Sequence, residues 1–182
     1  YQQEIMNGDM SAGVRFIYRE LGASLEDTDM GPVLAKKLAE MGIDDNVGQG
    51  SYYLLYNPGN DVTMSYDFDG DGTVDVVNMT ADELQIPKPE RTYKALEFTL
   101  QGELAKDLYI NASYLWSHSE GMTEGLVKSD TDRAAPGWTT SYDYADLMDH
   151  GFGDLPNDRR HYFKVAGRYN ITEDLTFGFA SR

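Results

Sequence analysis

The sequence contains no cysteine, so a disulfide framework, a zinc-thiolate site and a cysteine nucleophile are all excluded. Basic residues are scarce, because 15 lysines and arginines stand against 31 aspartates and glutamates and the net charge is -16. Nucleic-acid binding requires clustered cations, so we expect no nucleic-acid partner. No apolar run approaches the roughly 20 residues of a membrane helix, which excludes a helical membrane protein but not alternating membrane strands.

Catalytic signatures are missing as well. The chain has no GxSxG motif, no P-loop and no dinucleotide-binding fingerprint. His118, His150 and His161 are scattered and lack a metal-ligand spacing such as HExxH. We therefore expect these histidines to be loop or interfacial residues and the protein not to be an enzyme.

The sequence does contain period-two alternation, which is the period of a β-strand. In residues 93–104 one face carries Leu96, Phe98, Leu100 and Leu104, and the other carries Glu97, Thr99, Gln101 and Glu103. Residues 11–19, 108–118, 162–169 and 175–180 alternate similarly, with short polar breaks between partners. The pattern predicts three β-hairpins, at about 1–19, 93–118 and 160–181.

Two long polar segments, about 20–92 and 119–159, separate the hairpins. Short turns at one end and long loops at the other are typical of outer-membrane barrels, whose strands of about 9–11 residues match those predicted here. Charges such as Arg15 and Glu97 suit a wet lumen better than a dry core. Tyr18, Tyr114 and Trp116, near the long-loop ends, suit an interfacial aromatic girdle.

The sequence therefore predicts an all-β fold, an antiparallel transmembrane β-barrel fragment with long extracellular loops. A soluble antiparallel β-sandwich is the alternative, since its strands also alternate. The predicted strands are fewer than the roughly eight of the smallest barrels, so neighbouring strands are expected from outside these residues. The start at Tyr1 and the end within a predicted strand also indicate a fragment. Inside the first loop, Pro32–Met41 predicts a helix ended by Gly42, and Ser51–Tyr56 a short strand.

An acidic motif lies in the first long segment, where carboxylates recur at every second residue and a glycine, Gly72, follows the third of them. Calcium loops need oxygen ligands at this spacing and a glycine for the turn. The candidate calcium ligands are Asp67, Asp69, Asp71, Thr73 through its carbonyl, and Asp75. Asn78 stands where an EF-hand has its bidentate glutamate, and flanking helices are not evident, so an EF-hand is not predicted. An acidic turn without an ion is the alternative.

Opposite charges gather where the second long segment rejoins a strand, at Asn157, Asp158, Arg159 and Arg160. Arginine can pair with a carboxylate through two parallel hydrogen bonds. We expect these residues to fix the base of the second loop, as a structural cluster and not as a binding site.

The run RTYKALEFTL, the run YINASYLWSHSEG and the stretch LPNDRRHYF from Leu155 to Phe163 resemble the C-terminal barrel of TonB-dependent receptors, in particular the Oar-like subfamily. The resemblance extends over most of the chain. It implies a barrel of about 22 strands in the outer membrane of a Gram-negative bacterium, plugged by an upstream domain and energised through TonB. Its partners would be outer-membrane lipid, TonB, the plug and an unidentified ligand.

Two functions follow as hypotheses. The first is a TonB-dependent receptor that takes up a ligand, with its long loops outside the cell. The second is a calcium-stabilised extracellular β-module with a binding or adhesion role. They differ in their surroundings, because a transporter needs many more strands and a plug in the same polypeptide, whereas a module folds alone in water.

Overall fold

The computed structural model describes residues 1–45, 51–125, 127–129, 131–134 and 140–182. The chain divides into two compact units. The sheet unit consists of residues 1–20, 92–119 and 158–182, and the inter-strand unit consists of residues 21–91 and 120–157. Parts of the two expected loops, residues 46–50, 126, 130 and 135–139, lie outside the described residues.

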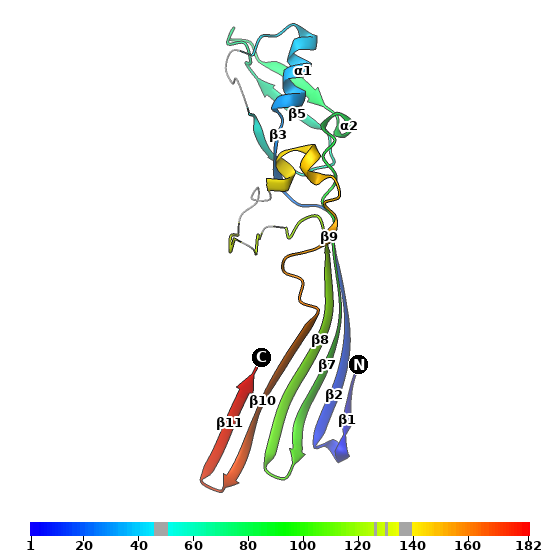
Figure 1. Cartoon of the computed structure of the whole chain (residues 1–182), viewed down its shortest axis with the longest axis vertical. Coiled ribbons are helices and arrows are strands. Elements are labelled where there is room, and N and C mark those ends of the chain that lie inside the picture. The colour runs from blue at the N-terminus through cyan, green and yellow to red at the C-terminus, as the bar shows by residue number, and fades with distance from the viewer. Residues whose placement is uncertain (46–50, 126, 130, 135–139) are drawn as a thin grey trace. The chain divides into compact units, whose positions relative to one another are not determined.

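The sheet unit contains long neighbouring strands in the order β1-β2-β7-β8-β10-β11 (Figure 1). They are β1 (Gln2–Ile5), β2 (Met10–Leu21), β7 (Arg91–Ala105), β8 (Leu108–Gly121), β10 (His161–Thr172) and β11 (Leu175–Ser181). The short turns between β1 and β2, β7 and β8, and β10 and β11 lie at one end of the sheet (Figure 1). The chain is mostly β-strand in antiparallel sheets, which confirms this part of the expected fold, although it also contains helices. β1 and β11 are the edges of an open sheet, so closure into a barrel of about 22 strands stays a prediction.

Two strands are longer than the sequence predicted. β7 has 15 residues and β8 has 14, against an expected length of about ten. Their pairing is extended further in the inter-strand unit, where Met122 N donates to Glu90 O at 2.9 Å and β9 (Gly153–Asp154) pairs with the end of β8. The extra length was missed because ladder hydrogen bonds join backbone groups and continue where side-chain alternation has stopped.

One face of the sheet unit is apolar and exposed. The register of β8 with β10 places Phe163 opposite Tyr114 and Val165 opposite Ala112, so apolar side chains of neighbouring strands share this face. Large side chains here are open to the surroundings: Phe16 is 69% exposed and Trp116 is 57% exposed. The apolar face is defined here by Val14, Phe16, Leu96, Phe98, Leu100, Ile110, Tyr114, Trp116, Phe163, Val165, Phe177 and Phe179.

The opposite face of the sheet unit is polar and holds its charges in pairs or against rings. Arg15 Nη2 lies 2.6 Å from Glu97 Oε2, which joins β2 to β7. The Arg168 guanidinium lies 5.5 Å from the centre of the Tyr109 ring across the β8–β10 pair. This face is therefore chemically unlike the apolar one, as period-two alternation requires.

The inter-strand unit has its own hydrophobic core, where the sequence predicted two long loops. Its elements are β3 (Glu26–Asp29), α1 (Gly31–Met41), β4 (Tyr53–Tyr56), β5 (Val62–Tyr66), β6 (Asp75–Met79), α2 (Ala81–Leu84) and the 3-10 turns Thr140–Asp143 and Ala145–Met148. The core contains Met30, Leu34, Leu38, Val62, Phe68, Val77, Met79, Leu84, Ile86, Tyr142 and Met148. Tyr142 and Met148 come from the second segment, so the core joins both segments. Because its elements are short, no long periodic pattern signalled it.

Helix α1 follows the sequence expectation closely. Pro32 occupies its first turn, where a missing N–H costs nothing, and Gly42 ends it with a left-handed φ of 73°. Leu34 and Leu38, one turn apart, are buried. Among the described residues, no helix combines the length and apolarity needed to cross a membrane.

Replacing Phe68 by alanine tests whether the core holds this unit together. Phe68 is fully buried, and its ring centre lies 6.0 Å from that of Tyr52 and 5.5 Å from that of Tyr66. Phe68→Ala should lower the local free energy of unfolding by about 3–5 kcal/mol through lost burial and cavity formation. Hydrogen exchange of the β5 and β6 amides measures this. Val76→Ala, on the exposed side of β6, is the matched control, and equal loss of protection in both variants would contradict the assignment.

Candidate functional site

The acidic motif forms a tight loop between β5 and β6 that is wrapped around one carboxylate. Asp67 Oδ1 accepts hydrogen bonds from Gly70 N at 2.8 Å and Asp71 N at 3.0 Å, and Asp67 Oδ2 accepts from Gly72 N at 2.9 Å. Gly70 and Gly72 have left-handed φ values of 77° and 92°, which other residues adopt at a cost. The glycine spacing therefore allows the backbone amides to turn inward on Asp67.

Three of the five predicted calcium ligands gather in this loop. Asp67, Asp69 and Asp71 each offer an oxygen, and these atoms lie within 4.8 Å of one another. The other two have different local partners. Asp75 Oδ2 accepts from Phe68 N at 3.2 Å, and Thr73 N donates to Asp71 Oδ1 at 2.6 Å. Asn78, which stands where an EF-hand has its bidentate glutamate, lies on β6 and accepts from Thr63 Oγ1 at 2.7 Å. Its side chain is therefore hydrogen-bonded within the β5–β6 pair.

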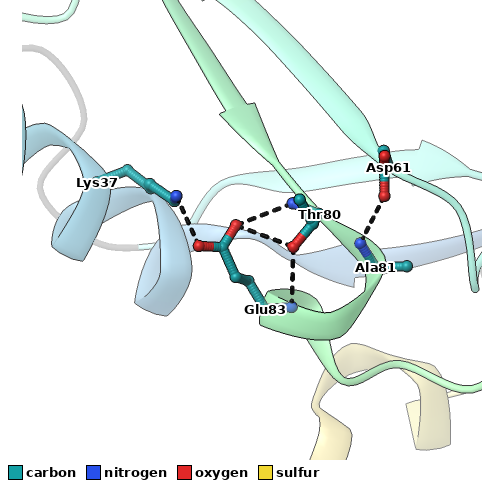
Figure 2. Close-up of polar contacts among 5 residues, drawn as sticks. All are labelled: Lys37, Asp61, Thr80, Ala81 and Glu83. Atoms are coloured by element: carbon teal, nitrogen blue, oxygen red, sulfur yellow. Dashed lines mark hydrogen bonds and ion pairs between the residues drawn. The ribbon is translucent and has the colours of Figure 1, made fainter.

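A capping box lies directly after β6 and links it to both helices (Figure 2). Glu83 N donates to Thr80 Oγ1 at 3.3 Å, and Glu83 Oε2 accepts from Thr80 N at 3.0 Å. The other oxygen of Glu83 lies 2.6 Å from Lys37 Nζ on α1, and Ala81 N donates to Asp61 at 2.8 Å. The Thr-x-x-Glu spacing of residues 80–83 is the sequence signature of a capping box, so the sequence could have indicated this cap. The ion pair with Lys37 could not be indicated in this way, because it depends on tertiary contacts.

The charges of this cap depend on one another. The hydrogen bond from Lys37 and those from Thr80 lower the pKa of Glu83 from its ordinary 4.5 to about 2. Reciprocally, the hydrogen bond to Glu83 raises the pKa of Lys37. The Lys37–Glu83 pair thereby ties α1 to the start of α2, on the same unit as the acidic loop.

Buried polar contacts join the two segments of the inter-strand unit. Thr28 Oγ1 donates to the Tyr142 carbonyl at 2.8 Å, and Thr123 Oγ1 donates to Glu26 Oε1 at 2.7 Å. Burial, and then the charge of Glu26, raise the pKa of the Tyr142 hydroxyl, so Tyr142 stays neutral. These contacts span about a hundred residues of sequence, and no local pattern could have indicated them.

The predicted loop-base cluster centres on Asp158. Its nearly buried carboxylate accepts from Ser119 N at 2.7 Å and lies 2.5 Å from Arg160 Nε. The Arg159 carbonyl accepts from Ser117 Oγ at 2.6 Å. The structure therefore places Asp158, Arg159 and Arg160 against the end of β8, where the second segment leaves and returns. Asn157 lies in the inter-strand unit.

Two surface cavities of the inter-strand unit had no counterpart in the sequence expectations. One, of about 560 Å³, has mainly apolar walls that include Leu21, Leu25 and Val127, with Arg91 among its polar groups. The Arg91 guanidinium donates to the Glu124 carbonyl, which fixes it at the cavity edge. The other, of about 340 Å³, is lined by residues of the second segment such as Lys128, Ser141 and His150.

The other two histidines lie in the sheet unit. His161 Nδ1 lies 2.7 Å from the Tyr114 hydroxyl, and the two rings are stacked with centres 6.1 Å apart. His118 lines a cavity together with Trp116. Both histidines therefore lie beside aromatic side chains, near the positions where the long segments begin and end.

Comparison with known proteins found one informative similarity. The chain is 30% identical over 158 residues to the "TonB-dependent transporter Oar" of Myxococcus xanthus. The matched region is 86% of this chain and 12% of that transporter. This chain is related to a TonB-dependent transporter. No family model matches the chain, and no solved structure matches it. The similarity supports the resemblance seen in the sequence at this coarser level, and the chain spans about an eighth of its relative.

Replacing Glu83 by glutamine should change the acid stability of the cap. Because folding lowers the pKa of Glu83, its ionised form contributes stability fully above pH 4.5, and this is lost as the pH falls toward about 2. Hydrogen exchange of the α2 amides should therefore differ most between wild type and Glu83→Gln above pH 4.5, and converge near pH 2. Asp82→Asn, which removes an exposed carboxylate outside the contacts of Figure 2, is the control. A constant difference across this range would refute the linkage.

Replacing Arg160 by alanine tests the loop base. Loss of the partner of Asp158 leaves a nearly buried carboxylate without that cation. Protease cleavage within residues 120–157 should rise several-fold while the strands of the sheet unit keep their hydrogen-exchange protection. The matched control is Arg168→Ala, farther along β10 on the polar face. Cleavage unchanged from wild type in Arg160→Ala would show that the cluster does not hold the segment.

Proposed function

We propose that this chain is part of the barrel wall of an Oar-type, TonB-dependent outer-membrane transporter, together with a folded extracellular unit inserted between its strands. The observation that carries the proposal is an antiparallel sheet whose apolar face stays exposed. The relationship to a TonB-dependent transporter supports it.

The apolar face suits lipid contact. In water, exposed apolar area costs about 25 cal/mol per Å², and contiguous apolar patches on soluble monomers are usually small. Here Phe16, Trp116 and Phe163 are more than half exposed and come from three different strands. Hydrocarbon chains would cover the aliphatic and aromatic carbon surface of these side chains. Aromatic residues at the long-segment ends of the strands, such as Trp116, would then lie at the membrane interface.

The polar face suits a water-filled lumen. Its charges include the Arg15–Glu97 pair, in which the Arg15 side chain is 67% exposed. A soluble β-sandwich buries its apolar face in a dry core, whereas Phe16, Trp116 and Phe163 of the apolar face are exposed here. A barrel exposes both faces to suitable surroundings. Closure requires further strands, about 22 in all, with an upstream plug in the lumen and TonB as the energising partner.

The inter-strand unit is the part of this chain best suited to contact the transported ligand, whose identity the chain does not reveal. In the proposed topology the unit faces the outside of the cell, because the short turns face the periplasm. Its surface cavities lie in the segments that such a barrel presents to incoming molecules. Its acidic composition favours cationic or metal-bridged ligands over free anions.

Cysteine labelling on intact cells tests this topology, since the chain itself has no cysteine. Asp82→Cys lies in the inter-strand unit, and Lys106→Cys lies in the short β7–β8 turn. In the complete natural polypeptide, free of other cysteines, a membrane-impermeant maleimide should label Asp82→Cys on intact cells. Lys106→Cys should react only after the outer membrane is opened. Labelling of both positions on intact cells would contradict the topology.

The same cells separate the two functional hypotheses. A transporter should fractionate with the outer membrane and should co-purify the C-terminal domain of TonB, which couples such proteins to the inner membrane. A calcium-stabilised extracellular module should be released without detergent and should not bind TonB. The extracellular module therefore remains the alternative hypothesis, and fractionation and TonB binding distinguish it from the transporter.

We also propose that the acidic loop binds calcium through Asp67, Asp69 and Asp71. Calcium prefers several oxygen ligands at about 2.3–2.6 Å, which clustered carboxylates can supply. Calcium should slow protease cleavage within residues 67–75, and EDTA should restore it. Asp71→Asn should remove the protection, whereas Asp82→Asn should keep it. Equal cleavage with and without calcium in the wild type would show that the loop is only an acidic turn.

A further inference from the structure

The outward face of the β3–β4 pair combines carboxylates with exposed aromatic and aliphatic side chains. Antiparallel pairing sets Asp27 opposite Leu55 and Asp29 opposite Tyr53, and directly opposite residues share one face of a sheet. The alternate residues of β3, Glu26 and Thr28, are buried, so the face with Asp27 and Asp29 points away from the core.

The second segment of the inter-strand unit adds a third carboxylate and a second tyrosine to this face. The 2.8 Å hydrogen bond from Thr28 to the Tyr142 carbonyl places the turn Thr140–Asp143 beside β3. A side-chain hydrogen bond joins Tyr53 to Tyr144, and these residues are 49% and 42% exposed. The aspartate–tyrosine face is defined here by Asp27, Asp29, Tyr53, Leu55, Asp143 and Tyr144.

The three carboxylates lie close enough together to repel one another. Burial, and then the charges of Asp27 and Asp29, raise the pKa of Asp143, whereas the charge of Lys128 lowers it by less than either aspartate raises it. Asp29 Oδ1 accepts from two backbone amides. Asp27 Oδ1 is enclosed and accepts no hydrogen bond from the residues that the structure describes. Folding therefore gathers negative charge here, and a cation from outside the chain would offset it.

The arrangement suits an organic cation better than a metal ion. Where carboxylates of the described residues could share a metal ion, their oxygens lie within 4.8 Å of one another, and Asp27, Asp29 and Asp143 do not form such a group. A guanidinium can stack on a tyrosine ring and also pair with a carboxylate through two hydrogen bonds. Its methylene stem can lie on an apolar side chain such as Leu55.

The spread of the carboxylates also bears on the size of the occupant. They come from β3 and from the turn Thr140–Asp143, so a ligand that carries more than one cation neutralises them more fully than a single guanidinium does. A second copy of this chain is a poor occupant, because its net charge of -16 would repel the face. A peptide with several arginines meets both requirements.

We propose that the aspartate–tyrosine face binds the arginine side chains of a peptide, with one guanidinium between Asp27 and Asp143 and against the Tyr53 ring. This names a ligand chemistry and a position for it within the inter-strand unit. The assignment of this peptide as the transported ligand rests on the proposed function, because it requires the unit to face the outside of the cell.

Fluorescence anisotropy with the complete natural polypeptide in a non-ionic detergent tests the face. The probe is a short acetylated peptide with two arginines separated by glycine and a neutral fluorophore. Its matched analogue has citrulline in place of arginine, which keeps the shape and removes the charge. The arginine peptide should bind, and the citrulline peptide should show no measurable binding. Free L-arginine should compete more weakly than the unlabelled arginine peptide.

Aspartate variants locate the binding. Asp27→Asn and Asp143→Asn should each weaken binding of the arginine peptide about tenfold, the loss expected for one hydrogen bond between charged groups. Asp82→Asn removes the same charge from an exposed position of the same unit and should bind as the wild type does. Asp143→Asn also relieves the repulsion from Asp27, so hydrogen-exchange protection of the β3 amides should not fall, which separates lost binding from unfolding.

Equal binding of the arginine and citrulline peptides, or no binding of either, by a protein with heat-modifiable mobility overturns the face and leaves the barrel proposal standing. Equal weakening by Asp143→Asn and Asp82→Asn reduces the effect to net charge and overturns the face. Free L-arginine that competes as strongly as the peptide overturns the peptide assignment. If the arginine peptide binds as expected to a protein that leaves the cells without detergent, the face stands and the transporter proposal fails.

Discussion

The backbone hydrogen-bond ladder is the interaction on which the sheet unit depends. This unit has little buried core, since most of its large apolar side chains are exposed. Its strands are held instead by antiparallel pairing, as in the nine successive partners of β8 and β10 from His161↔Trp116 to Tyr169↔Leu108. In a bilayer each unpaired backbone group costs several kcal/mol, so such pairing is worth more there than in water. The same sheet placed in water would lack the apolar burial that normally stabilises a domain.

The inter-strand unit is stabilised mainly by the burial of apolar side chains. Its strands are short, with β3 paired to β4 and β5 paired to β6, and its stability comes from side chains such as Leu34, Phe68 and Tyr142 packed in one core. In the proposed barrel, a segment that leaves the wall meets water, so it can fold as a soluble domain does. Within this unit, the buried hydrogen bonds of Thr28 and Thr123 join residues of the first segment to residues of the second. This explains how segments of such length avoid the entropy of free loops.

Charge is used differently in the two units. In the inter-strand unit carboxylates satisfy backbone amides, as Asp67 does in the acidic loop and Glu83 does at the start of α2. In the sheet unit, Glu97 of the polar face meets the arginine of a neighbouring strand. The acidic residues of the chain therefore have different structural roles in the two units.

The sequence by itself determined the features that depend on near neighbours along the chain. Alternation of Leu96, Phe98 and Leu100 with polar residues identified β7, and Pro32 with Gly42 delimited α1, because strand faces and helix caps are set within a few residues. The acidic loop was also recognisable, since its turn depends on Gly70 and Gly72. Only the tertiary structure decided that Tyr142 enters the core of a segment a hundred residues earlier, that Lys37 pairs with Glu83, and that Asp143 lies near Asp27 and Asp29. These contacts depend on register and packing between distant segments, and a local pattern carries no information about which distant residue will arrive beside it.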